Sequence, residues 1–270
     1  MRHYDAQNRR LVYLTGTARP DDWDERWSRS ALEKLFTPGR NAWLVAETRR
    51  YLPAGAVVLE GGCGCADKVY SLKAAGYRAI GFDTAQKTVN RALEVCPELN
   101  IAVGDIRNLP LEDGTIDGYW SLGVFEHFQE GMQAQWEEGA RVIRNGGYLF
   151  LTVPIMSPLR RLKARLNAYP ALTEIPEGSF YQYAYSTQTI VSSAEANGFV
   201  LVSARLFDGI KGMKDEVPVL QPALQRLYDS KSLFARVLRR FVDVAFRSLS
   251  GHMGYFVFRR TVAIATKPPR

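Results

Sequence analysis

Four short segments carry side chains that could hold a charged or hydroxylated ligand or accept a proton. The richest is 57–69, VVLEGGCGCADKV, in which an acid precedes three glycines interrupted by two cysteines. Two further acids, Asp83 and Asp105, end the runs RAIGFD and NIAVGD, and His127 stands in SLGVFEHF. The first segment has two interpretations: a thiolate site for a metal or redox reaction, or a glycine-rich loop around a nucleotide-like ligand.

The cysteines of this segment, Cys63 and Cys65, fit a metal site poorly. One residue separates them, whereas common zinc sites place two residues between paired thiolates, and no further cysteine or histidine lies nearby. We therefore expect no metal and interpret both as small residues that fill loop positions. The chain has only three cysteines, which favours a reducing compartment. Because residues 1–16 are too polar for a signal peptide and no apolar run approaches about 20 residues, we expect a soluble, cytoplasmic protein.

Between residues 56 and 154 the sequence alternates between two patterns, and these predict the elements that position the side chains. Five β-rich runs are separated mostly by segments with helical spacing, 66–76, 84–96 and 131–145; the runs lie at 56–60, 78–83, 100–105, 116–123 and 147–154. Strand and helix in repetition predict right-handed βαβ units and a mostly parallel sheet. The strands are almost continuously apolar, as expected when helices cover both faces.

The acids fall at one edge of this predicted sheet. Glu60, Asp83 and Asp105 each end one of three successive strands, and the carboxyl ends of parallel strands line the crevice in which open α/β sheets bind ligands. Three carboxylates in one crevice would repel a pyrophosphate. They suit a ligand with an ammonium group, a ribose diol and an adenine amine.

On these residues the run 56–154 resembles the class I S-adenosylmethionine-dependent methyltransferases. The family motif of an acid followed by alternating glycines is matched by Glu60, Gly62 and Gly64, with Ala66 in place of the last glycine. The resemblance extends to 180–202 as the late helix and sixth strand. It implies an α/β, Rossmann-like fold with a seven-stranded, mostly parallel sheet in the order 3-2-1-4-5-7-6, the last strand antiparallel, and helices on both faces.

The same resemblance implies S-adenosyl-L-methionine as the cofactor and assigns its contacts. Glu60 is expected near the methionine amino group, Asp83 on the ribose hydroxyls, and Asp105 with Ile106 at the adenine. The expected cofactor-binding residues are Glu60, Gly61, Gly62, Cys63, Gly64, Asp83, Thr84, Asp105, Ile106, Ser121 and Leu122.

His127 is the candidate catalytic residue. It follows the fourth strand, at the rim where a methyl acceptor should lie, and its ordinary pKa suits a general base; a structural hydrogen bond is the alternative. An aromatic run, FYQYAYS at 180–186, is either a wall of the acceptor site or packing between helix and sheet. The expected substrate-binding residues are Glu126, His127, Tyr181, Tyr183 and Tyr185.

The predicted organisation has three parts. Residues 1–52 form an N-terminal helical lid, in which Trp23 and Trp27 share one helix face. Residues 53–207 and 251–270 form the methyltransferase core, with a cap segment at 155–186. Residues 208–250 form a helical insertion, and because it joins the sixth and seventh strands at the ligand edge of the sheet, we expect it over the active crevice.

Within this insertion, 232–250 is strongly amphipathic. Leu233, Phe234, Val237, Leu238, Phe241, Val242, Ala245 and Leu249 share one face, and Arg236, Arg240, Asp243 and Arg247 the other. One interpretation is a helix packed on the domain. The other is a basic amphipathic helix that makes peripheral contact with an anionic membrane or grips a lipid-like acceptor.

The sequence therefore predicts a methyltransferase that moves a methyl group to an oxygen or nitrogen atom of a small apolar or anionic molecule by in-line displacement. Two rivals stay open, a nucleotide-dependent oxidoreductase and a non-catalytic methyltransferase-like binding protein. The net charge of +7 also allows nucleic acid. We do not expect that partner, because no Asn-Pro-Pro-Tyr-type motif follows the fourth strand. The sequence does not predict the acceptor or the oligomeric state.

Overall fold

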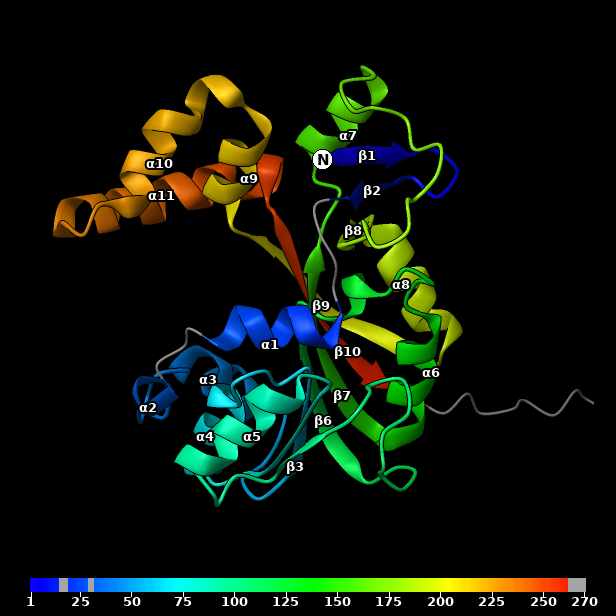
Figure 1. Cartoon of the computed structure of the whole chain (residues 1–270), viewed down its shortest axis with the longest axis vertical. Coiled ribbons are helices and arrows are strands. Elements are labelled where there is room, and N and C mark those ends of the chain that lie inside the picture. Colours follow the sequence, from blue (N-terminus) through cyan, green and yellow to red (C-terminus); the bar gives the residue numbers. More distant parts are fainter. Residues whose placement is uncertain (15–18, 29–31, 262–270) are drawn as a thin grey trace, which may run out of the picture.

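In the computed structural model, residues 1–14, 19–28 and 32–261 are described. A seven-stranded sheet runs through the molecule with helices on both sides (Figure 1). Its strands, in spatial order, are β5 (Ile101–Val103), β4 (Arg78–Asp83), β3 (Val57–Gly61), β6 (Ile116–Leu122), β7 (Ile143–Pro154), β10 (Met253–Arg260) and β9 (Phe199–Phe207). Neighbouring strands from β5 to β7 are parallel, and β10 is antiparallel to both of its neighbours. The predicted order and the antiparallel last strand are confirmed.

Two hydrophobic clusters flank the sheet, because successive side chains of each strand point to opposite faces. One cluster contains Val58 of β3 and Trp120 of β6. The other contains their sequence neighbours Leu59 and Tyr119. The helices α3 (Ala42–Arg49), α4 (Asp67–Ala74) and α5 (Gln86–Val95) contribute to the cluster of Val58. On the other face lie α6 (Gln133–Val142) and α8 (Thr187–Ala196).

The N-terminal region differs from the predicted helical lid. Residues 1–14 contain two strands, β1 (Arg2–Asp5) and β2 (Arg10–Tyr13), which form a separate three-stranded sheet with β8 (Gln182–Ala184). In this sheet Val12 pairs with Tyr183, which is 171 residues away in the sequence. No local sequence pattern could therefore predict the pairing. The two helices that follow are α1 (Pro20–Ser28) and the short α2 (Leu32–Leu35). The predicted lid, 1–52, also included positions 15–18 and 29–31, which are outside the described residues.

The remaining elements lie after β6. They are a 3₁₀ turn η1 (Phe125–His127), α7 (Pro158–Arg165) and, between β9 and β10, the helices α9 (Gly209–Glu216), η2 (Pro218–Leu220), α10 (Gln221–Asp229) and α11 (Leu233–Ser250). The segment 208–250 is therefore helical, and it leaves the sheet where Met253 pairs with Pro154 at the carboxyl end of β7. Of the predicted core segment 251–270, positions 262–270 are outside the described residues.

Candidate functional site

The glycine loop after β3 is folded against the end of β4. The N–H groups of Gly62 and Cys63 donate to the carbonyl of Phe82 at 2.8 and 3.0 Å, and the N–H of Gly64 donates to Asp83 Oδ2 at 2.7 Å. Gly62 has a φ of 74°, in the left-handed region, and a Cβ there would lie 2.4 Å from Val124. Ala66, the departure from the motif, also adopts a left-handed conformation with a φ of 60°. The loop therefore keeps its tight curl at the cost of some backbone strain in Ala66.

Glu60 is a buried acid with an unfilled hydrogen-bonding position. Its side chain is 2% exposed; Oε1 lies 3.9 Å from Lys68 Nζ, and Oε2 has no partner among the described residues. Burial raises the pKa of Glu60 to about 8, against the opposing effect of Lys68. The carboxyl is therefore mostly neutral at pH 7, and a cation placed beside it would ionise it. This fits the ammonium group of the implied cofactor.

Asp83 connects the glycine loop to the start of α5. Besides Gly64, it accepts a hydrogen bond at Oδ1 from the N–H of Ala85 at 2.8 Å. Burial raises the pKa of its carboxyl, and these backbone donors oppose the shift. A carboxylate offers about four acceptor positions, so both oxygens retain a lone pair for a ribose diol.

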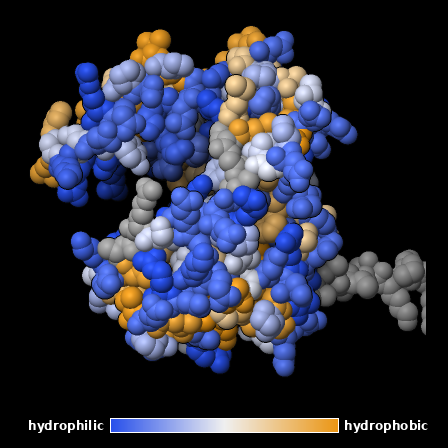
Figure 2. Space-filling model, viewed as in Figure 1, coloured by the Kyte–Doolittle hydropathy of each residue, from blue (hydrophilic) through white to orange (hydrophobic). Residues whose placement is uncertain are grey.

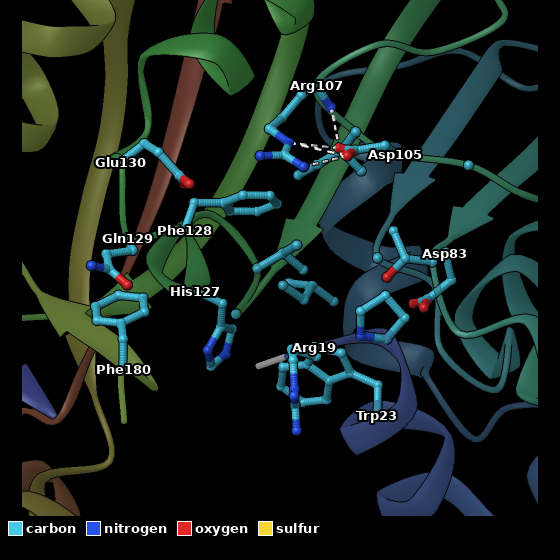
Figure 3. A pocket seen from close by; sticks show the side chains of 18 of the residues that line it. Arg19, Trp23, Asp83, Asp105, Arg107, His127, Phe128, Gln129, Glu130 and Phe180 are labelled. Carbon is cyan, nitrogen blue, oxygen red and sulfur yellow. Dashed lines mark hydrogen bonds and ion pairs between the residues drawn. The ribbon is translucent and has the colours of Figure 1, made fainter. Parts of the chain in front are cut away.

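Asp105 is paired with a residue that the sequence did not single out. Arg107 Nε lies 3.1 and 3.0 Å from the two carboxylate oxygens, and its Nη2 lies 2.6 Å from Oδ2 (Figure 3). Burial opposes ionisation, but the hydrogen bonds from Arg107 prevail and lower the pKa of Asp105. The guanidinium also lies over the ring of Phe128, 4.9 Å from its centre. The short spacing of Asp105 and Arg107 was the available signal for this pair.

These elements enclose a cavity of about 610 Å3, within the size range of small-molecule sites. Of the predicted cofactor residues, Gly62, Asp83, Thr84, Asp105, Ile106 and Leu122 line it. Glu60, Gly61, Cys63, Gly64 and Ser121 are in the adjoining loop and strand ends and are not on its wall. Ser121 is fully buried, and its Oγ has no partner among the described residues.

His127 lies on the wall opposite the acids, beside Gln129 and Phe180 (Figure 3). Its Nδ1 is 2.7 Å from the carbonyl oxygen of Tyr181. Since a carbonyl only accepts, Nδ1 carries the proton and Nε2 of the neutral ring carries a lone pair. Burial lowers the pKa of His127 to about 4, Arg26 contributes in the same direction, and the bond to Tyr181 opposes the shift. At neutral pH the imidazole is therefore an uncharged proton acceptor.

Helix α1 forms a third wall of the cavity. Trp23 and Trp27 both line it, and the ring of Trp23 contacts His127 edge-on with 4.9 Å between centres. The helix is held by Asp24, whose buried carboxylate accepts hydrogen bonds at the start of α5. The donors are the N–H groups of Lys87 and Thr88, at 3.2 and 2.7 Å, and the Thr88 hydroxyl at 2.8 Å. Sequence reasoning found the two tryptophans but missed Asp24, because its partners lie more than 60 residues away.

The other predicted substrate residues are placed differently. Tyr181 is outside the cavity lining and accepts a hydrogen bond from Arg26 at 2.6 Å. Tyr183 and Tyr185 are buried in the hydrophobic cluster beside β8, so for them packing, the alternative interpretation, describes the geometry. Glu126 is also buried, with its pKa raised to about 8 by desolvation. It does not line the cavity.

The insertion and the cysteines are also separate from the cavity. Of the cap segment, Glu177, Gly178 and Phe180 line the cavity, whereas no described residue of 208–250 does. Cys63 and Cys65 are buried, and burial raises the pKa of the Cys63 thiol. In the part of the chain that the structure describes, no cluster of three or more His, Cys, Asp or Glu side chains could hold a metal ion.

Comparisons with known proteins agree with this geometry. Residues 59–151 match the family model of a methyltransferase domain. The chain is 34% identical over 102 residues to a probable S-adenosylmethionine-dependent methyltransferase of Mycolicibacterium smegmatis, covering 37% of this chain and 39% of that protein. It is 37% identical over 106 residues to a 37.1 kDa protein of transposon Tn4556 from Streptomyces fradiae, covering 37% and 30%. The match thus spans about a third of the length of these curated relatives.

Solved structures share the fold across most of the chain. A complex between the Haloferax volcanii Trm112 methyltransferase activator and a putative methyltransferase contains a chain that aligns with a TM-score of 0.57 at 17% identity, over 89% of this chain and 98% of that one. Geranyl diphosphate C-methyltransferase of Streptomyces coelicolor aligns with a TM-score of 0.56 at 13% identity, over 92% and 100%. Together with the strand order, these findings show a match to a methyltransferase domain over residues 59–151 and the fold of the class I methyltransferases across most of the chain.

Proposed function

We propose that this protein transfers a methyl group from S-adenosylmethionine to an oxygen or nitrogen atom of a small molecule held in the cavity beside His127. One observation carries the proposal. The bond from His127 Nδ1 to the carbonyl of Tyr181 leaves Nε2 as a proton acceptor, and His127 lines the cavity. A hydroxyl or phenol acceptor must lose its proton during transfer, and an amine must be neutral.

The cofactor-binding residues contact different parts of S-adenosylmethionine. S-adenosylmethionine supplies an activated methyl group on its sulfonium. Glu60 compensates the ammonium charge, and Asp83 accepts hydrogen bonds from the ribose. Asp105 and Ile106 contact the adenine. Catalysis then depends chiefly on positioning, because holding the acceptor in line with the methyl group avoids the entropic cost of bringing them together.

The acceptor side of the cavity combines aromatic and charged side chains. Trp23, Phe128 and Phe180 provide apolar surface, and the acids Glu130 and Glu177 also line the cavity. The lining cations Arg19 and Arg107 are paired with Asp22 and Asp105. The aromatic surface favours an acceptor with an apolar body.

Other partners are compatible with the same fold. The likeness to a methyltransferase complexed with Trm112 leaves a larger acceptor or a helper protein as a second candidate. The match of residues 59–151 to a methyltransferase domain argues against the oxidoreductase alternative. The non-catalytic alternative is excluded only by turnover.

The test is release of S-adenosylhomocysteine from a panel of small hydroxyl, phenol and amine acceptors, followed by mass spectrometry. For a hydroxyl acceptor, His127→Gln should lower kcat by roughly 10²- to 10⁴-fold while cofactor affinity stays unchanged. The wild-type rate should rise with pH through the His127 pKa of about 4, and the variant should lack that limb. Equal kcat in both proteins would make His127 a structural residue; turnover confined to RNA or protein acceptors would contradict the small-molecule assignment.

A further inference from the structure

Helix α11 presents a wide hydrophobic face to solvent. Its exposed apolar side chains are Leu233 (74%), Phe234 (77%), Val237 (49%), Leu238 (39%), Phe241 (71%), Val244 (55%) and Leu249 (45%). At about 100° per residue, these positions together with Ala245 and Ser248 fall in one arc of about 160° that contains no charged residue. An uncharged surface of this extent marks an interaction site.

The helix meets the domain through a different face. Ala235 and Ser250 are buried, and Val242 and Phe246 pack against the cluster of Ile210, Met213 and Leu224 from α9 and α10. This packed face is nearly opposite the exposed arc. The exposed apolar side chains are therefore not those through which α11 packs on α9 and α10. Figure 2 shows hydrophobic atoms at the outer end of α11, whereas the side of α9–α11 turned to the viewer is mostly hydrophilic.

Arginines follow one edge of the exposed arc. Arg236, Arg240 and Arg247 project between the apolar arc and the packed face, about 20° to 60° beyond Leu233 on the helical wheel. Arg247 pairs with Asp243 at 3.4 Å, whereas Arg236 and Arg240 have no partner among the described residues. Cations beside a hydrophobic arc are placed as in a helix lying at the surface of an anionic bilayer, with apolar side chains below the headgroups.

A cavity of about 590 Å3 lies along the same edge. It is lined by four cationic side chains, Lys211, Arg236, Arg239 and Arg240, and by two acids, Asp208 and Asp243. Leu233 and Val237 of the apolar arc also reach it. A cationic hollow that continues into an apolar face complements an anionic headgroup joined to acyl chains. Among the described residues no helix is long and apolar enough to cross a membrane.

We propose that α11 docks this protein on bilayers containing anionic phospholipid. The apolar arc enters the boundary between headgroups and acyl chains, and the Arg-lined cavity receives a headgroup phosphate. This inference does not depend on methyl transfer, because no described residue of the insertion lines the cofactor cavity.

The test is co-sedimentation of the full chain with vesicles of phosphatidylcholine, with and without phosphatidylglycerol. We expect binding only to the anionic vesicles, weakening as salt is added. Replacing both Phe234 and Phe241 with serine should abolish binding. Replacing Arg236 and Arg240 with glutamine should weaken it by roughly 10- to 30-fold. In Phe241→Trp the new indole fluorescence should shift to the blue with anionic vesicles.

The matched control is the double variant Val200→Ser, Val202→Ser, since these side chains of β9 are 51% and 47% exposed but lie outside α11. It should bind like wild type, and thermal unfolding should confirm that every variant is folded. Absence of binding to anionic vesicles would overturn the proposal, as would equal binding to neutral ones. Wild-type dimers that the two serines dissociate would assign the face to a second copy of the chain and also overturn it.

Discussion

Helices α1 and α11 both carry large apolar side chains, but those of α1 line a cavity and those of α11 are exposed to solvent. In α1, Trp23 and Trp27 line the cavity beside His127, and Asp24 fixes the helix to α5 through three hydrogen bonds. In α11, Phe234 and Phe241 are more than two thirds exposed. An amphipathic pattern thus predicts that a helix has an apolar face, but it does not predict whether that face lines a cavity or lies at the surface.

The two helices should respond very differently to substitution. The largest effect is expected for Asp24→Ala, which leaves the buried N–H groups of Lys87 and Thr88 without an acceptor. The free energy of unfolding should fall by about 2 kcal/mol, and cofactor affinity by roughly 10-fold because α1 forms a cavity wall. Chemical denaturation measures the free energy of unfolding, and calorimetry measures the cofactor affinity. The control, Asp21→Ala in the exposed first turn, should stay within about 0.5 kcal/mol; equal losses in both would contradict the anchoring role.

A smaller effect is expected for Trp23→Ala. Water would reach His127, so its pKa should rise from about 4 toward the ordinary 6.5, as measured by NMR titration. A histidine whose pKa is lowered by folding makes the protein less stable as pH falls from about 6.5 to about 4. The variant should therefore lose less stability across this window than wild type does. Trp43→Ala, on the far helix α3, is the control; a His127 pKa unchanged by Trp23→Ala would show that the tryptophan does not shield the imidazole.

The smallest effect is expected on α11. Phe241 is 71% exposed, so Phe241→Ser should change the free energy of unfolding by no more than about 0.5 kcal/mol and leave cofactor affinity unchanged. The same two assays apply. A loss of about 2 kcal/mol or more would mean that this face is packed, and the contrast between the helices would disappear.

The sequence predicted the fold, and it predicted that the glycine loop and two of the acids meet at one edge of the sheet, because these signals are local. The glycine loop, Asp83 and Asp105 each follow directly from a strand, and parallel strands bring their carboxyl ends to one edge. Ala66 adopts the left-handed conformation that a glycine would readily adopt at this position, so the loop keeps its shape although the last glycine of the motif is absent.

The missed features depend on contacts between distant segments. The strand β2 pairs with β8 only after more than 160 intervening residues, and Asp24 finds its donors on α5. Tyr183 is part of that pairing, opposite Val12, whereas Tyr185 follows β8 and forms a bridge with Ile155. The sequence FYQYAYS alone does not predict either contact. The helical periodicity of α11 was correct, but which arc met the domain depended on where α9 lay.

The central claim is that the Glu60 loop binds S-adenosylmethionine, and calorimetric titration at about pH 6.5 in buffers of different ionisation enthalpy tests it directly. Glu60, with a pKa of about 8, is protonated in the free protein, and the ligand's ammonium should ionise it. Binding should therefore release about one proton. Glu60→Gln should bind roughly 10- to 100-fold more weakly and release none. Glu126→Gln, which removes the other buried acid with a pKa of about 8, should behave like wild type. No binding by wild type, or proton release that survives Glu60→Gln, would contradict the account.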